Sequence, residues 1–169
     1  RWISDALGVP IIDNYWQTET GWPLMTIANG VQKKASKFGS PGLPMYGWKV
    51  KLVHETTGEE LTKPNEKGVM VVESPTPPGF MQTVWRDDAR FLKTYWQSIP
   101  GKTLYNTFDW GIRDEDGYYY ILGRTDDVIN VAGHRLGTRE IEESISSHPN
   151  VAEVAVVGIA DKLKGQVAI

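Results

Sequence analysis

Two arginines lie eleven positions apart in the segment YYYILGRTDDVINVAGHRLGTR, residues 118–139: Arg124 directly after Gly123, and Arg135 two residues after Gly133. A charged side chain between strands costs free energy unless an opposite charge or a ligand pairs with it. The planar guanidinium group can bind phosphate or carboxylate through two parallel hydrogen bonds. The segment therefore points to an anion site, while pairing with Asp126 and Asp127 is the alternative interpretation.

A second polar segment, DNYWQTETG at residues 13–21, follows the apolar run at residues 9–12. We expect that run to be a buried strand, and open α/β sheets bind ligands beyond the carboxyl ends of their strands. Hydroxyls and a carboxylate at this place suit a phosphate oxygen and Mg²⁺, which takes oxygen ligands. A turn rich in polar residues is the alternative interpretation.

A third candidate is Asp109, in the sequence FDWG at residues 108–111. A carboxylate here would be able to accept hydrogen bonds from two ribose hydroxyls, as acidic residues do in nucleotide sites. An aspartate this close to a glycine is more often a turn residue, so Asp109 taken alone favours a turn, with the ribose site as the alternative. His134, taken alone, is more often a structural residue than a catalyst.

The composition of the 169 residues narrows the classes of protein. The net charge of -3 and the pI of about 5.6 give no general basic field for nucleic acid. The chain has no cysteine, which excludes disulfides, zinc–thiolate sites and a cysteine nucleophile and fits a cytoplasmic location. No apolar run approaches the roughly 20 residues that span a bilayer, so we expect no membrane segment. Both ends of the chain look cut, so we expect a piece of a longer protein.

The elements that must position these residues follow from hydrophobic periodicity and turn signals. We expect a helix end at residues 1–8, strands at 48–53, 68–72, near 104–105 and at 118–122, and a helix at 87–96. A helix at 138–148, begun by Thr138, and a strand at 151–159 complete a β-α-β pattern. The fold class is therefore α/β with a β-rich subdomain, and we expect domains at residues 1–125 and 126–169.

Taken in order, YWQTETG, FDWG and GRTDDVINVAGHRLGTREIEESISSHPNVAEVAVVG closely resemble the acyl-CoA synthetases of the adenylate-forming superfamily. The resemblance extends over residues 3–169. Within the superfamily, NYW, GWP, PMYG and PG followed by MQT are most similar to the propionate-activating enzymes, with the acetate-activating enzymes next. The resemblance implies a fragment of the adenylate-forming fold. Its parts would be the end of an α/β sheet subdomain, a distorted β-barrel subdomain and the start of a small, truncated α+β C-terminal domain.

The resemblance also implies the chemistry of an AMP-forming CoA ligase. A short-chain carboxylate, propionate rather than acetate, would attack the α-phosphate of ATP with Mg²⁺ present, and the acyl group would then pass to coenzyme A. The implied nucleotide site contains residues of the first two motifs and the two arginines: Asp13, Asn14, Tyr15 and Gln17 at the adenine, Thr18 at a phosphate, Asp109 at the ribose hydroxyls, Arg124 near the ribose and Arg135 at a phosphate. Thr18 and Arg135 would be the catalytic residues. The remaining roles fall to four positions: Trp16 closes the acyl pocket, Glu19 holds the metal, Gly133 leaves room for the pantetheine arm of coenzyme A, and Asp126 is the hinge of a mobile C-terminal domain.

The resemblance also places essential parts outside the chain. The phosphate-binding loop would lie before Arg1 and the catalytic lysine after Ile169, because Lys162 and Lys164 come too early. We therefore expect the 169-residue chain alone to be inactive. A non-catalytic module that keeps the fold is one alternative. An amino-acid-activating or luciferase-like enzyme is another, against which the bulk of Trp16 argues.

Overall fold

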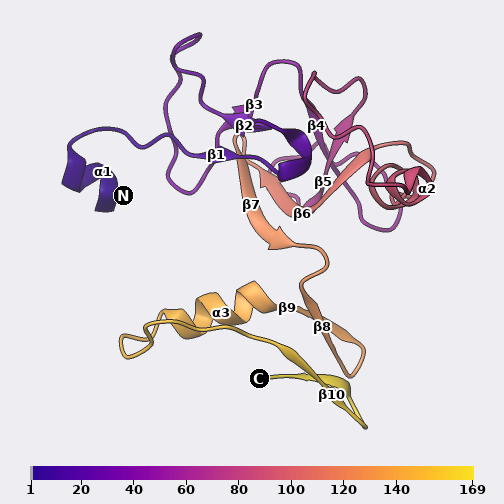
Figure 1. The fold of residues 1–169 in the computed structure, drawn as a ribbon. Coiled ribbons are helices and arrows are strands. Elements are labelled where there is room, and N and C mark those ends of the chain that lie inside the picture. The colour runs from indigo at the N-terminus through magenta and orange to yellow at the C-terminus, as the bar shows by residue number, and fades with distance from the viewer. Residues whose placement is uncertain (1) are drawn as a thin grey trace. The chain divides into compact units, whose positions relative to one another are not determined.

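The computed structural model describes residues 2–169, apart from the side chain of Arg135. The chain divides into two compact units, Arg1–Leu122 and Gly123–Ile169, shown in Figure 1. Among the described residues, no helix is long and apolar enough to cross a membrane.

The first unit contains two antiparallel sheets and short helices (Figure 1). The smaller sheet has the order β1-β2-β3, and the larger has the order β4-β5-β6-β7. The strands are β1 Asn14–Tyr15, β2 Met25–Thr26, β3 Leu43–Pro44, β4 Lys49–Val53, β5 Gly68–Glu73, β6 Tyr105–Arg113 and β7 Tyr119–Arg124, the last of which runs across the division between the units. The helices are α1 Trp2–Leu7, the 3₁₀ turn η1 Thr18–Thr20, α2 Asp88–Phe91 and the π-helical turn η2 Leu92–Trp96.

Strand β5 is buried along its length because both faces of the larger sheet are covered. Successive side chains of a strand point to opposite faces, so Met70 and Val72 lie on one side, and Val69 and Val71 on the other. The first pair belongs to a cluster that includes Leu24, Met25, Trp48, Leu52, Phe80, Phe91 and Tyr105. The second pair packs with Val53, Ile99 and Leu104. The hydrophobic effect therefore fixes this sheet from both sides.

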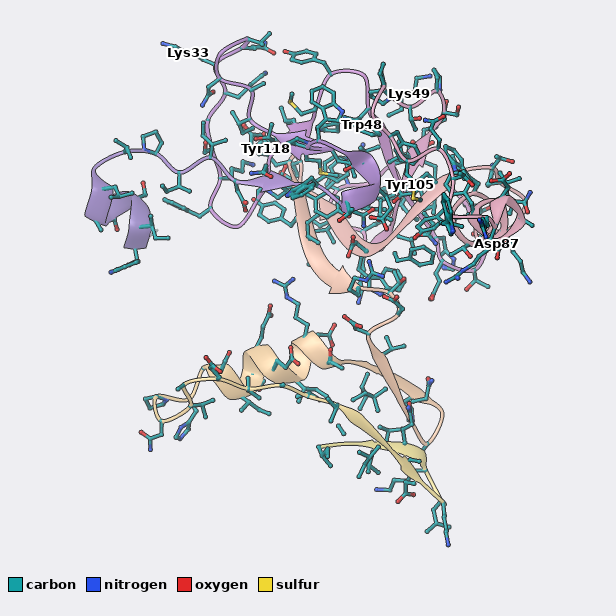
Figure 2. The ribbon with its side chains drawn as sticks, viewed as in Figure 1. Lys33, Trp48, Lys49, Asp87, Tyr105 and Tyr118 are labelled. Atoms are coloured by element: carbon teal, nitrogen blue, oxygen red, sulfur yellow. The ribbon has the colours of Figure 1, made fainter. Side chains whose placement is uncertain are left out.

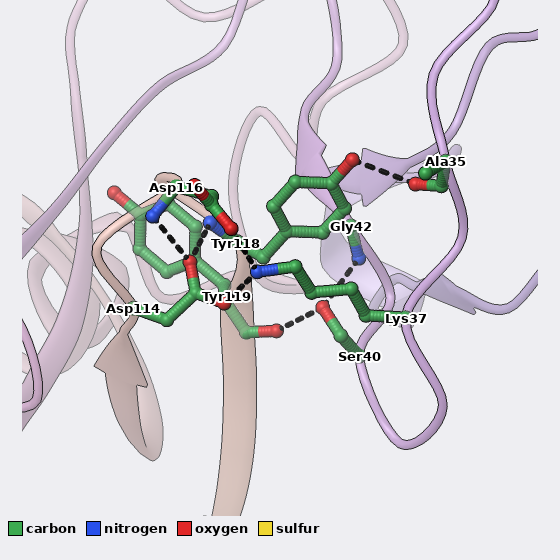
Figure 3. A network of polar contacts seen from close by, with 8 residues as sticks. All are labelled: Ala35, Lys37, Ser40, Gly42, Asp114, Asp116, Tyr118 and Tyr119. Carbon is green, nitrogen blue, oxygen red and sulfur yellow. Dashed lines mark hydrogen bonds and ion pairs between the residues drawn. The ribbon is translucent and has the colours of Figure 1, made fainter.

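A polar network fastens the loop before β3 to the turn between β6 and β7 (Figure 3). The Lys37 ammonium donates to Asp114 Oδ2 at 2.5 Å and Asp116 Oδ2 at 2.6 Å, and it lies 4.6 Å from the centre of the Tyr118 ring. The Ser40 hydroxyl donates to the carbonyl of Tyr119 at 2.5 Å. Burial raises the pKa of Asp114, but hydrogen bonds from Lys37 and the backbone outweigh burial and lower it overall.

The second unit contains the antiparallel sheet β10-β11-β8-β9 and one helix. Its elements are β8 Val128–Val131, β9 His134–Gly137, α3 Thr138–Ser146, β10 Gly158–Asp161 and β11 Gly165–Ala168. The β8–β9 hairpin turns through Ala132 and Gly133, both of which have positive φ, 50° and 87°. Two positive φ angles are the signature of the type I′ turn, whose twist matches that of the flanking strands.

Most of the elements expected from the sequence are confirmed, but two strands are not. Residues 9–12 form no strand, and Val9, Ile11 and Ile12 are exposed, so a buried strand here is wrong. The strand expected at 151–159 begins only at Gly158. The amide of Val156, which would otherwise serve a strand ladder, instead donates to Glu142 Oε1 on α3 at 2.9 Å.

Candidate functional site

The site is centred on Asp109, which lies in an irregular part of β6. Val69 of β5 pairs with Trp110 while Val71 pairs with Asn106, so the β6 strand carries extra residues at this point. Phe108 adopts a φ of 60°, and its amide donates to the side chain of Asn106 at 2.8 Å. Such bulges redirect a side chain, and positive φ in a bulky residue stores strain. Here the bulge leaves Asp109 only 7% exposed.

The buried carboxylate of Asp109 accepts hydrogen bonds from the segment at residues 13–21. The Tyr15 hydroxyl donates to its Oδ2, and the Gln17 side-chain amide donates to the same oxygen at 2.9 Å. Gln17 also donates to the carbonyl of Thr107 at 2.7 Å and accepts from the hydroxyl of Tyr105 at 2.8 Å. Tyr105, labelled in Figure 2, is itself buried. Residues more than ninety positions apart are thus joined in one network.

The state of the Tyr15 hydroxyl follows from its surroundings. Burial, followed by the negative charge of Asp109, raises the pKa of Tyr15 far above its ordinary value. Both causes disfavour the phenolate. The hydroxyl therefore stays protonated across physiological pH and remains a donor to the carboxylate.

The turn η1 positions the next two residues of the motif. The backbone N–H of Gln17 donates to the Thr20 hydroxyl at 3.0 Å. The turn ends at Gly21, whose φ is 71°. A Cβ at Gly21 would lie 2.6 Å from the carbonyl oxygen of Gly79, so only glycine fits. Between these fixed ends, Thr18 is exposed, and the half-buried Glu19 accepts at Oε1 from the Tyr95 hydroxyl at 3.3 Å.

Other residues proposed for the site lie apart from this network. Trp16 is 56% exposed. Asn14 is exposed, and its backbone N–H donates to the carboxylate of Asp13 at 2.8 Å. Asp13 borders a separate cavity of about 380 Å³ whose walls include Trp2, Ile3, Ile11, Ile27, Lys37 and Phe38. The structure thus gathers Tyr15, Gln17 and Asp109, whereas no described contact joins Asp13, Asn14 or Trp16 to the carboxylate.

The second unit contains the remaining candidates. Arg124 donates through Nε and Nη2 to the two carboxylate oxygens of Asp126, both at 2.8 Å, so the ion pair considered from the sequence is present. These bonds from Arg124, opposed by partial burial, lower the pKa of Asp126. The space at the Cα of Gly133 is open: apart from Gly133 and its two chain neighbours, no atom of the described residues lies within 4 Å of an added Cβ. The side chain of Arg135 lies outside the described part of the structure.

Three residues of the site were not singled out in the sequence. Tyr105 and Thr107 share the buried face of β6 with Asp109, and Tyr95 comes from η2. The alternation of residues 105, 107 and 109 along one strand was the available signal. Tyr95 gave no such signal, because an aromatic residue in an amphipathic helix is usually part of the core.

Among the described residues, a metal ion would be held by a single carboxylate and not by a preformed cluster. Within that part of the chain, no three His, Asp or Glu side chains gather as a preformed metal site. Glu19 has no cationic side chain within 4 Å among the described residues. Mg²⁺ is commonly held by one or two carboxylates together with the phosphates of a substrate, and Glu19 fits that arrangement.

Two family models match parts of the chain, and curated relatives match nearly all of it. A family model described as AMP-binding enzyme matches residues 1–85, and one described as AMP-binding enzyme C-terminal domain matches residues 140–169. Propionate–CoA ligases of Salmonella typhimurium and Escherichia coli are each 67% identical over 168 residues, which is 99% of this chain and 26% of theirs. Acetyl-coenzyme A synthetase 1 of Candida glabrata is 47% identical over 170 residues, covering 98% of this chain and 23% of that protein. The chain therefore spans about a quarter of the length of these curated relatives.

A solved structure shares the arrangement of the backbone. The ATP-bound RpMatB-BxBclM chimera superposes with a TM-score of 0.77 at 25% sequence identity, over 95% of this chain and 30% of the chimera.

Proposed function

Because the chain belongs to the AMP-binding enzyme family, we propose that it is a segment of an AMP-forming propionate–CoA ligase. The observation that carries this proposal is the network that joins the buried carboxylate of Asp109 to Tyr15 and Gln17. Burying a carboxylate costs free energy, so a carboxylate that Tyr15 and Gln17 hold in a fixed orientation favours a binding role over a purely structural one. Such a carboxylate is well suited to a ligand that presents hydroxyl groups.

In this proposal Asp109 binds the two ribose hydroxyls of ATP. A charged acceptor forms stronger hydrogen bonds than a neutral one, and a fixed carboxylate loses little freedom when the nucleotide binds. Tyr15 and Gln17 orient that carboxylate and, with Asp13 and Asn14, border the adenine.

The phosphates would lie near η1. We assign Thr18 as the hydroxyl that contacts a phosphate oxygen and Glu19 as the ligand of Mg²⁺. When bound, the cation neutralises charge on the phosphates. The protein's own contribution is to hold the acceptor atoms in place, because phosphoryl and adenylyl transfer depend chiefly on positioning and charge stabilisation.

For the second unit, we assign Arg124 to the ribose, Arg135 to a phosphate and Gly133 to the passage of the pantetheine arm of coenzyme A. The proposed domain boundary lies between Thr125 and Asp126, with Asp126 as the hinge. Arg124 pairs with Asp126 in this structure, and in this proposal it binds the ribose in addition.

Propionate is the proposed acid, supported by 67% identity to two propionate–CoA ligases. Trp16 would limit the acyl pocket to short chains. Acetate is the second candidate, supported by the similarity to acetyl-coenzyme A synthetase 1. A cytoplasmic location stays a prediction.

The test is carboxylate-dependent exchange of pyrophosphate into ATP by the full-length protein. We expect propionate to give the highest kcat/KM among acetate, propionate and butyrate. Acetate as the best substrate would favour the second candidate. Absence of exchange with all three acids, from a protein that is folded by circular dichroism, would refute the ligase proposal.

A further inference from the structure

Two stacked tyrosine rings contact the segment DNYWQTETG, residues 13–21, through their hydroxyl groups. The rings of Tyr95 and Tyr105 are nearly parallel, with an interplanar angle of 4° and centroids 5.7 Å apart. Each hydroxyl binds a different residue of the motif: Tyr105 donates to Gln17 Oε1 at 2.8 Å, and Tyr95 donates to Glu19 Oε1 at 3.3 Å. One aromatic stack thus supports two separate parts of the candidate site.

The place of Tyr95 is fixed by its backbone and by its neighbours. It lies in the π-helical turn η2, and single π turns are frequent at functional sites because they change the direction of a side chain. Its ring also packs against Phe91, with centroids 5.9 Å apart, and edge-on against Phe108, with centroids 6.0 Å apart. A ring held on three sides presents its hydroxyl in one direction, which is toward Glu19.

We infer that Tyr95 is a positioning residue, which orients the carboxylate of Glu19 for a divalent cation bound with the nucleotide. This inference rests on the proposed function. A hydrogen bond at Oε1 restricts rotation of the carboxylate and leaves Oε2 to face the cation. Partners that orient a metal ligand in this way typically change metal affinity by about 10- to 100-fold when removed, and the 3.3 Å distance places Tyr95 near the lower end.

The test uses the full-length protein and two matched variants, Tyr95→Phe and Tyr105→Phe. Each variant removes one hydroxyl from the same stack and keeps both rings, so both should unfold at nearly the same temperature. Mn²⁺ binding is titrated by electron paramagnetic resonance with α,β-methylene-ATP present, a nucleotide that cannot be cleaved at the α-phosphate. We expect Tyr95→Phe to weaken Mn²⁺ binding about tenfold. Tyr105→Phe should weaken binding of the nucleotide, but at a concentration of α,β-methylene-ATP that saturates each variant it should leave Mn²⁺ binding nearly unchanged.

A double-mutant cycle with Glu19→Gln separates positioning from a general structural effect. If Tyr95 acts through Glu19, Tyr95→Phe will change Mn²⁺ binding no further in the Glu19→Gln protein. Equal Mn²⁺ affinities in wild type and Tyr95→Phe would overturn the inference, as would an equal loss in both backgrounds. Failure of the proposed function is seen separately, because wild type would then lack propionate-dependent exchange.

Discussion

The substitution Tyr15→Phe tests the central network of the site. It removes the hydroxyl group that donates to the carboxylate of Asp109. This carboxylate is 7% exposed, and it still accepts a hydrogen bond from Gln17 in the variant. A hydrogen bond to a charged group contributes about 1.5–3 kcal/mol net. At about 1.4 kcal/mol per factor of ten, this corresponds to a loss of roughly 10- to 100-fold. Because Gln17 still donates to the carboxylate, we expect about a tenfold rise in KM for ATP, measured by pyrophosphate exchange in the full-length protein.

The matched control is Tyr46→Phe. Tyr46 is 56% exposed, and its hydroxyl has no hydrogen-bond partner among the described residues, so this variant should behave as wild type. Since burial and Asp109 keep Tyr15 protonated, the effect of Tyr15→Phe should be constant from about pH 6 to pH 9. If both phenylalanine variants have the same KM for ATP, Asp109 does not need the Tyr15 hydroxyl and the network has been misinterpreted.

Three further predictions concern the acyl pocket, the turn and the loop network. Trp16→Gly should raise the ratio of kcat/KM for butyrate over propionate by about tenfold or more, and an unchanged ratio would remove Trp16 from the pocket. Gly21→Ala and Gly101→Ala both place alanine at positive φ, which costs about 1 kcal/mol, but only the first also meets a backbone oxygen. The Gly21 variant should therefore lose about 1–3 kcal/mol more in denaturant unfolding, and equal losses would contradict the close contact. Lys37→Met should increase hydrogen exchange in the loop that carries it at neutral pH. Because the pKa of Asp114 is lowered in the folded state, this difference should persist above about pH 4 and fade as the pH drops further.

The sequence was sufficient for two strands of the larger sheet and for the family. Alternating residues predicted β4 and β5, and both strands form where expected. The family resemblance and the fragment of the adenylate-forming fold are confirmed by the two family models and by the structural neighbour. These features depend on local periodicity and on the order of motifs along the chain, which a single sequence displays directly.

The bulge at Phe108 was not predictable in the same way. Positive φ is usually marked by glycine or asparagine, and a phenylalanine gives no such mark. Tyr15, which donates a hydrogen bond to Asp109, lies 94 positions earlier. An aspartate followed two residues later by glycine, taken alone, therefore favoured a turn. Only the pairing of distant segments decides between the two interpretations.

Residues 151–157 show how one side chain can override a strong strand signal. Their β-branched residues favour a strand, yet the carboxylate of Glu142 takes the amide of Val156. Val157 still exchanges backbone hydrogen bonds with Ile169, at 3.1 and 3.0 Å, so the chain reaches the sheet only after that point. The β-propensity of the segment thus determines which region joins the sheet, while the Glu142 carboxylate determines the residue at which pairing begins.

The tyrosines of the first unit connect the core to the site. A buried aromatic residue contributes apolar area, but a buried hydroxyl must also find an acceptor. Tyr15, Tyr95 and Tyr105 each meet that need with a polar residue of the site: Asp109, Glu19 and Gln17 respectively. The packing that stabilises the sheet therefore also fixes the direction of these polar groups. It follows that replacing a tyrosine here by phenylalanine should change ligand binding much more than stability, whereas replacing it by leucine should change both.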